Sequence, residues 1–122
     1  QSDWAFASIE DVRSNFINAK VDLKGVNFIK GDVVETLKLN ENIPNNICVL
    51  RLDTNFYEST KMEIETLYPR LELGGSLLLD DYGSWEGSKK ATDDYLNSLS
   101  NKKRPLMSFV DAAGRSLIKV RS

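Results

Sequence analysis

The 122-residue sequence contains no histidine and one cysteine, Cys48. Without histidine, neither a Ser-His-Asp triad nor a Cys-His pair is available for catalysis, and a metal site lacks the commonest nitrogen ligand. A single cysteine cannot form an intramolecular disulfide, which agrees with a reducing cytoplasm, the compartment that we expect. Because Cys48 lies inside an apolar run, it is predicted to be an inert core residue.

A basic excess and long apolar runs are missing as well. The net charge is -2, so nucleic acid is not an expected partner. No apolar run approaches the roughly 20 residues of a membrane span, and Gln1–Ser8 has neither the basic start nor the apolar core of a signal peptide. With 41% hydrophobic and 28% charged residues, the sequence is typical of a soluble globular protein, and its length suits one compact domain over residues 1–122.

Two short apolar runs each end on aspartate. Ile47–Leu52 precedes Asp53, and residues 76–79 follow a predicted turn at Gly74-Gly75 and precede Asp80 and Asp81. Both runs are typical of buried strands in a parallel sheet that is covered on both faces.

A helical segment over residues 56–71 separates the two runs, so they form a strand–helix–strand unit. Such crossovers are right-handed and bring the carboxyl ends of both strands to one edge of the sheet, which is where ligands bind in open α/β sheets. Asp53, Asp80 and Asp81 are therefore expected to converge.

Three convergent carboxylates repel one another unless a positive charge lies among them. Carboxylate oxygens suit Mg²⁺, Ca²⁺ or Mn²⁺. Spacing alone leaves a second interpretation open, in which these aspartates only end strands or cap helices. Arg51, inside an apolar strand, is predicted to pair with a carboxylate or to reach the surface.

Flanking segments have clear local signals. Ser8 and Asp11 have the spacing of a capping box before a helix that runs to about Ala19. Val26–Lys30 is predicted to be a strand that ends at Gly31-Asp32, followed by a short helix over residues 33–39.

The second half of the chain continues with further local signals. Asn55 is predicted to cap the next helix, with Glu58 in the third position, and charged residues of that helix such as Glu63 are expected mostly off its apolar face. Another helix is predicted over Glu86–Ser100, with Asp93-Asp94 on a solvated face. The chain then ends in two predicted strands, residues 106–111 and 116–121, joined as an antiparallel hairpin.

Longer motifs carry a resemblance to a known family. They are Leu50–Lys61, which reads Leu-Arg-Leu-Asp-Thr-Asn-Phe-Tyr-Glu-Ser-Thr-Lys, then Leu67–Leu71, Gly74-Gly75 and Asp80–Gly83. In this order and spacing the chain closely resembles the macrocin-type sugar O-methyltransferases from near Ser8 to its end. These are class I, S-adenosylmethionine-dependent enzymes that methylate sugar hydroxyls on macrolides and related natural products.

The resemblance implies a Rossmann-like sheet with a terminal antiparallel hairpin. It also implies a Mg²⁺ held by Asp53, Asp80 and Asp81, which binds adjacent hydroxyls of an acceptor sugar, and a nearby carboxylate that takes the proton. S-adenosylmethionine is the implied cofactor, and Gly31, Asp32 and Asp53 are the residues expected beside it.

Two departures from the family pattern matter for function. Asn55 occupies the position of the family's base, and an amide cannot accept that proton. The family's glycine-rich cofactor turn and the acidic residue after its second strand are not found, so we expect the C-terminal portion of a methyltransferase domain, without its first strands. An open sheet edge then favours a homo-oligomer.

Two functions stay open on the sequence alone. One is a metal-dependent O-methyltransferase, truncated and weakly active or inactive as this chain. The alternative is a non-catalytic, oligomeric binding or scaffold module derived from such an enzyme. Tyr82 and Trp85 either wall a sugar or cofactor pocket or belong to the core.

Overall fold

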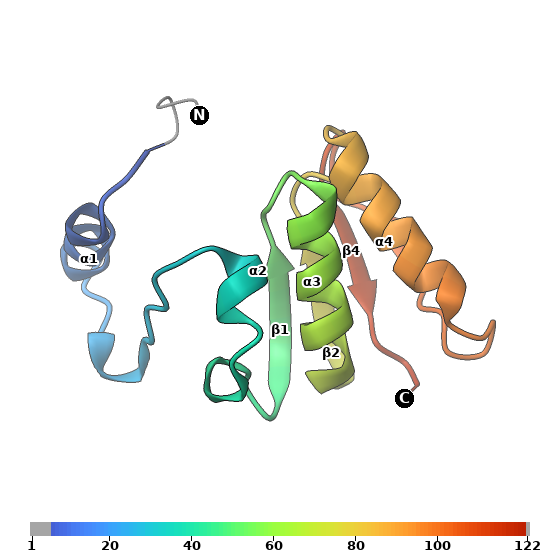
Figure 1. The fold of residues 1–122 in the computed structure, drawn as a ribbon, viewed down its shortest axis with the longest axis horizontal. Coiled ribbons are helices and arrows are strands. Elements are labelled where there is room, and N and C mark those ends of the chain that lie inside the picture. Colours follow the sequence, from blue (N-terminus) through green and yellow to red (C-terminus); the bar gives the residue numbers. More distant parts are fainter. Residues whose placement is uncertain (1–5, 122) are drawn as a thin grey trace.

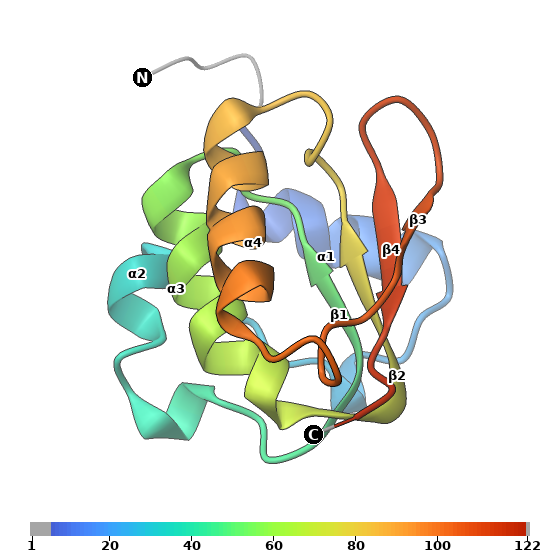
Figure 2. The same ribbon diagram turned by 90° about the vertical axis from the view of Figure 1, so that its right-hand side faces the viewer.

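The computed structural model describes residues 6–121. Its centre is a four-stranded sheet in the order β1-β2-β4-β3 (Figure 1; all four strands are labelled in Figure 2). The strands are β1 (Ile47–Leu52), β2 (Leu71–Leu79), β3 (Met107–Phe109) and β4 (Arg115–Ile118). Strands β1 and β2 are parallel, whereas β4 is antiparallel to both β2 and β3. The predicted strand–helix–strand unit and the terminal hairpin are both confirmed.

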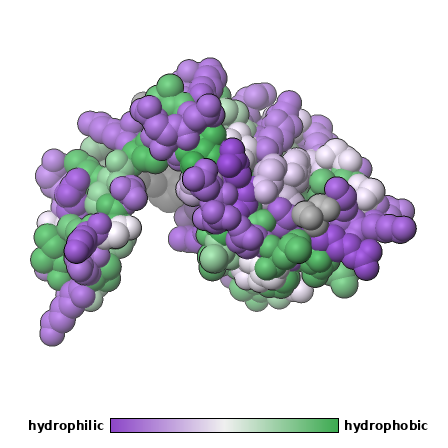
Figure 3. Space-filling model, turned by 90° about the horizontal axis from the view of Figure 1, so that it is seen from below, coloured by the Kyte–Doolittle hydropathy of each residue, from purple (hydrophilic) through white to green (hydrophobic). Residues whose placement is uncertain are grey.

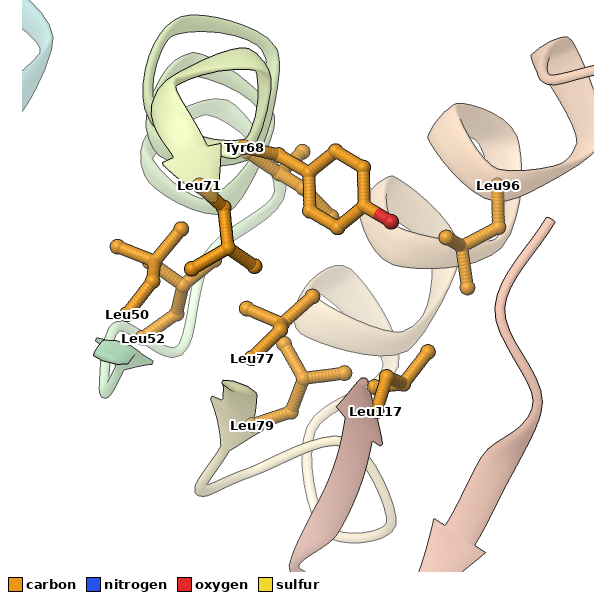
Figure 4. Packing of buried hydrophobic residues seen from close by; sticks show 9 residues of the cluster. Leu50, Leu52, Tyr68, Leu71, Leu77, Leu79, Leu96 and Leu117 are labelled. Atoms are coloured by element: carbon orange, nitrogen blue, oxygen red, sulfur yellow. The ribbon is translucent and has the colours of Figure 1, made fainter. Parts of the chain in front are cut away.

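Two helices, α3 (Tyr57–Leu67) and α4 (Glu86–Ser98), lie on the same side of this sheet (Figure 2). A short 3-10 turn, Tyr68–Arg70, joins α3 to β2. Leucines at alternate strand positions point toward the helices and form the core, together with Ile64, Tyr68 and Leu96 (Figure 4). Each buried leucine stabilises the fold by about 1.5–3 kcal/mol, so this layer carries most of the packing energy.

The opposite face of the sheet corrects one prediction. Both faces were expected to be covered, but within residues 6–121 the helices cover only one. Val49 is 62% exposed, and Ile118 is exposed too. Cys48 is also exposed, near the start of β1, which is an edge strand among the described residues, so the prediction of Cys48 as a core residue is wrong.

The glycine pair lies inside a strand instead of forming a turn. Ile47 pairs with Leu71 but Val49 pairs with Ser76, so β2 bulges over the residues between those partners. Gly74 has φ +81°, which favours glycine. A Cβ on Gly75 would lie 2.9 Å from the Cys48 carbonyl oxygen. Gly74 therefore allows the backbone to turn within the bulge, and Gly75 lets β2 pass close to β1.

Residues 6–32, here called the arm, lie apart from the sheet (Figure 1). The capping box predicted at Ser8 and Asp11 is present and starts α1 (Ile9–Asn18). All of α1 is described, and none of its residues is buried. Figure 3 shows a hollow between the arm and the rest of the described chain (residues 33–121, here called the body), with apolar surface on both. The irregular start predicted for Gln1–Ala7 concerns mainly Gln1–Ala5, which lie outside the described residues.

The predicted strand Val26–Lys30 is wrong. This segment has no strand pairing, because a strand needs a hydrogen-bonded neighbour and the described residues place none beside it. It leads instead from a 3-10 turn (Leu23–Gly25) toward α2 (Val33–Thr36). A further 3-10 turn, Asn40–Asn42, precedes β1. None of the helices in residues 6–121 is long and apolar enough to cross a bilayer.

The tip of the β3–β4 hairpin is fixed to the loop after β2. The Gly83 N–H donates to the Ala113 carbonyl at 2.8 Å, and a Cβ on Gly83 would lie 2.0 Å from the Ala112 carbonyl oxygen. Asp111 Oδ1 accepts the N–H groups of Ala113 and Gly114 at 2.9 and 2.6 Å. This contact joins the hairpin to the segment that carries Asp80 and Asp81.

Candidate metal centre

Three carboxylates meet at the carboxyl ends of β1 and β2. One oxygen from each of Asp53, Asp80 and Asp81 lies within 4.8 Å of the others. The Asp80 N–H donates to the Leu52 carbonyl at 3.0 Å, which continues the parallel pairing to the point where the acids begin. The convergence that strand order predicted is therefore present in the structure.

Arg51 supplies a positive charge among these acids. Its Nη2 lies 3.0 Å from Asp53 Oδ2 and 2.9 Å from Asp80 Oδ1. Asp80 raises the pKa of Arg51, and in return the guanidinium lowers the pKa of Asp80. Partial burial, and then the neighbouring Asp80 carboxylate, raise the pKa of Asp53. The carboxylate partner predicted for Arg51 is confirmed.

The chemistry of this cluster fits a hard divalent cation. All three groups present carboxylate oxygens, they converge from two strand ends, and they stay accessible to solvent. Arg51 already neutralises part of their charge, so a cation has to enter beside the guanidinium or displace it from Asp53 and Asp80.

Asn55 does not cap α3, which corrects the second predicted capping box. Phe56 is the N-cap residue, without a side-chain cap hydrogen bond, and the helix begins at Tyr57. The start is fixed from inside the helix instead, because Thr60 Oγ1 donates to the Thr54 carbonyl at 3.1 Å and the Thr60 N–H donates to the Phe56 carbonyl. Asn55 stays half-exposed in the loop after Asp53.

Two aromatic residues flank the strand ends. Phe56 and Trp85 occupy the N-cap positions of α3 and α4, and their rings meet edge to face with centroids 6.2 Å apart. Phe56 is 70% exposed and Trp85 is 40% exposed. The Trp85 N–H donates to the Asp81 carbonyl at 2.9 Å, so this pair is tied to the acidic loop.

Tyr82 lies in the loop after β2 and links that loop to α4. It packs against the core, and its hydroxyl donates to Asp93 at 2.6 Å, while Lys89 bonds the same carboxylate. Asp94 accepts from Tyr57 and Lys90 in the same way. Asp93 and Asp94 thus lie on the solvated face of α4, as predicted, and their side chains also tie α4 to Tyr82 and Tyr57.

Glu63 is the residue that periodicity missed. It was expected off the apolar face of its helix, but it is only 7% exposed and faces the loop after β1. Thr54 Oγ1 donates to Glu63 Oε2 at 2.7 Å. Burial raises the pKa of Glu63, and Asp53 raises it further. The sequence around Thr54 did not indicate that Glu63 would be its partner, because the hydrogen bond joins residues nine positions apart.

Gly31 and Asp32 lie at the start of α2, outside the acidic cluster. Asp32 Oδ1 accepts the Val34 N–H at 2.9 Å and caps that short helix. Gly31 has φ +144°, and a Cβ there would lie 2.8 Å from Thr36 Cγ2. Both residues thus have a local structural role, and their place beside a cofactor stays a prediction.

The fold of the described residues is α/β with a mixed four-stranded sheet, and it corresponds to part of a Rossmann-like class I methyltransferase domain. It matches the solved structure of the O-methyltransferase NovP with a TM-score of 0.84 and 31% sequence identity, over 94% of this chain and 46% of that one. The model of the Macrocin-O-methyltransferase (TylF) family matches residues 2–115. The chain therefore belongs to the macrocin O-methyltransferase family.

Two curated relatives are 36% identical to the chain over 88 residues. One is the demethyldecarbamoylnovobiocin O-methyltransferase of Streptomyces niveus, which covers 72% of this chain. The other is the 8-demethyl-8-(2,3-dimethoxy-alpha-L-rhamnosyl)-tetracenomycin-C 4'-O-methyltransferase of Streptomyces olivaceus, which covers 71%. The matched region spans 33% and 32% of their lengths, so the chain corresponds to about a third of each relative.

Proposed function

We propose that this chain forms the metal- and acceptor-binding part of an S-adenosylmethionine- and divalent-metal-dependent O-methyltransferase. Its acceptor would be a hydroxyl of a sugar or another small molecule. The observation that carries the proposal is the convergence of Asp53, Asp80 and Asp81 in a member of the macrocin O-methyltransferase family. The names of both curated relatives, which are O-methyltransferases of natural products, support the acceptor class.

The three aspartates would hold Mg²⁺ or another hard divalent cation. When bound, such a cation lowers the pKa of an acceptor hydroxyl and helps to orient it. The remaining work of the chain is positioning, because the sulfonium of S-adenosylmethionine is already a good methyl donor. We keep Gly31, Asp32 and Asp53 as the proposed residues beside that cofactor.

Arg51 has a separate role in this proposal. Without a cation, its guanidinium balances the charge of Asp53 and Asp80. With a cation present, fewer negative charges remain for Arg51 to pair with, so its contacts with these acids should loosen. Arg51 thereby holds Asp53 and Asp80 together before a metal ion binds. It also lowers the affinity for the metal ion, because the ion has to compete with the guanidinium for these carboxylates.

Asn55 limits the chemistry. It lies two residues after Asp53, in the position of the family's base, and its amide cannot take the hydroxyl proton. We therefore propose that metal and acceptor binding survive here while turnover is weak or absent. If turnover is absent, the chain serves as a non-catalytic binding module, which is the alternative function.

Phe56 and Trp85 are the proposed wall for the acceptor ring. They are exposed, they touch each other, and each is linked to the acidic loops by its place in the chain. Exposed aromatic faces suit the apolar face of a sugar ring or the ring of a natural product. The acceptor would then lie between this pair and the carboxylates.

Calorimetric titration of the chain with S-adenosylmethionine, with and without Mg²⁺, tests the proposal. Micromolar cofactor binding that depends on Mg²⁺ supports the enzyme. Mg²⁺ binding without cofactor binding, lost in Asp81→Asn, supports the non-catalytic alternative with a surviving metal site. Failure to bind either ligand contradicts both the cofactor and the metal assignments.

We further propose that the chain self-associates in the cytoplasm. Strand β1 is an edge strand among the described residues, and Val49 within it is largely exposed. The arm also leaves its apolar residues unburied. An open edge and an uncovered apolar face both recruit further copies of a chain. A monomeric mass by light scattering, at concentrations up to those used for titration, would contradict this part.

A further inference from the structure

A buried carboxyl group lies behind the loop that carries Asp53. Glu63 is in the middle of α3, and its side chain turns toward the sheet instead of toward solvent. Its hydrogen-bond partner in the structure is Thr54, the residue directly after Asp53. The acidic cluster of Asp53, Asp80 and Asp81 does not include Glu63.

Thr54 is held at both its side chain and its backbone. Its hydroxyl donates to Glu63 Oε2 at 2.7 Å, and its carbonyl accepts from Thr60 Oγ1 at 3.1 Å. The two hydroxyls of Thr54 and Thr60 also lie 3.3 Å apart. Thr60 and Glu63 are three residues apart and hence share one face of the helix. This face therefore fixes the loop directly behind the first proposed metal ligand.

Packing alone does not favour glutamate at this position. A buried carboxyl group gives up its hydration and recovers part of it in one hydrogen bond, whereas leucine or methionine would fill similar space without that cost. Ile64, its neighbour in the same helix, shows that apolar side chains fit this layer. What glutamate adds is an acceptor aimed at Thr54.

We propose that Glu63 is a positioning residue, which acts through Thr54 to hold the Asp53–Asn55 loop in the geometry needed for metal binding. The metal part of this inference rests on the proposed function. The loop-fixing part does not, because it concerns the order of residues 53–55 with or without a cation. The two parts are therefore measured separately.

The first measurement is the backbone order of residues 53–55 by NMR relaxation without metal. In the unmodified chain the order parameters should be near 0.85, as in rigid backbone, and in Glu63→Ala and Thr54→Val they should fall below about 0.6. Glu63→Gln should keep rigid values, because the amide oxygen still accepts from Thr54. Glu65→Ala is the matched control, since it removes an exposed carboxylate from the same helix.

The second measurement is the dissociation constant for Mg²⁺ by calorimetry, well below the unfolding temperature of every variant. Loss of a residue that supports a metal ligand weakens binding by roughly 10–100-fold, and we expect this for Glu63→Ala and Thr54→Val. Glu63→Gln and Glu65→Ala should bind like the unmodified chain. A purely structural Glu63 would change the unfolding temperature while leaving both this constant and the loop order unchanged.

The outcomes separate the two claims. Rigid loops in both Glu63→Ala and Thr54→Val, or unchanged Mg²⁺ affinity in both, would overturn the positioning role. If Glu63→Ala does not fold, Thr54→Val decides whether the positioning role holds. It removes the same hydrogen bond by changing its other partner, Thr54, which is only half-buried. If the unmodified chain binds no Mg²⁺, the proposed metal site fails, and the order parameters still decide whether Glu63 fixes the loop.

Discussion

The arm and the body of this chain contain equally clear local signals but differ in what those signals produce. In the arm, a complete capping box starts α1, yet none of the helix residues is buried. In the body, α3 begins without a side-chain cap and still buries Thr60, Glu63 and Ile64 against the sheet. Caps thus set where a helix begins, whereas stability comes from a partner surface. A ten-residue helix without such a partner is marginal in water.

The largest expected effect is in the core of the body. Leu77→Ala should lower the free energy of unfolding by about 2–5 kcal/mol, because it opens a cavity between the sheet and both helices. Chemical denaturation measures this directly. Ile17→Ala in the arm is the matched control, and because Ile17 is 61% exposed its effect should stay within about 0.5 kcal/mol. Equal effects at both positions would remove the distinction between arm and body.

The next largest effect is expected for metal binding at the carboxyl ends of β1 and β2. Asp81→Asn removes one of three convergent carboxylates, so Mg²⁺ affinity should fall at least about tenfold in calorimetry. Asp94→Asn is the control, since it removes an exposed acid that pairs with Lys90 on α4. Equal losses of affinity in both variants would indicate general charge attraction instead of a site.

A smaller effect concerns the pH dependence of the body. Burial raises the pKa of Glu63 above its unfolded value, so the folded state binds the proton more strongly. This contribution to stability is fully present below the unfolded pKa and is lost as pH rises through the folded pKa. Glu63→Gln cannot titrate, so its unfolding temperature relative to the unmodified chain should be higher at pH 8 than at pH 4. A pH-independent difference would contradict the buried carboxyl.

The smallest effect is expected for the cap of the arm. Ser8→Ala should cost α1 about 1 kcal/mol of helix stability, visible as reduced helical chemical shifts over residues 9–18. The unfolding temperature of the body should not change, because α1 does not pack on the sheet (Figure 1). A lower unfolding temperature would mean that the arm packs against a body in solution, its own or that of a second copy.

Much of the body could be predicted because its signals are local. Ile47–Leu52, with Asp53 after it, has the length and composition of a strand, and the hairpin ends on a glycine-containing loop. The convergence of the acids followed from strand order alone. Arg51 was expected to pair with a carboxylate or to reach the surface, and it does both.

Three of the errors share one physical cause, which is that the correct answer depends on neighbours distant in sequence. Val26–Lys30 has the composition of a strand but no partner strand among the described residues. Cys48 resembles a core residue until the sheet puts β1 at an edge. Glu63 has the pattern of a surface residue, and only the folded chain brings the Thr54 hydroxyl within hydrogen-bond distance of it. Periodicity describes one element, while burial depends on two.

The contact between Gly83 and the hairpin tip has a practical consequence for protein engineering. Hairpin tips are usually chosen for inserting epitopes, fluorophores or whole reporter domains, since exposed loop tips tolerate added residues. Here Ala112 and Ala113 lie directly against the backbone of Gly83. A label grafted at this tip would therefore push on the loop that carries Asp80 and Asp81, whereas the loop at Ser100–Lys103, after α4, offers a safer attachment point.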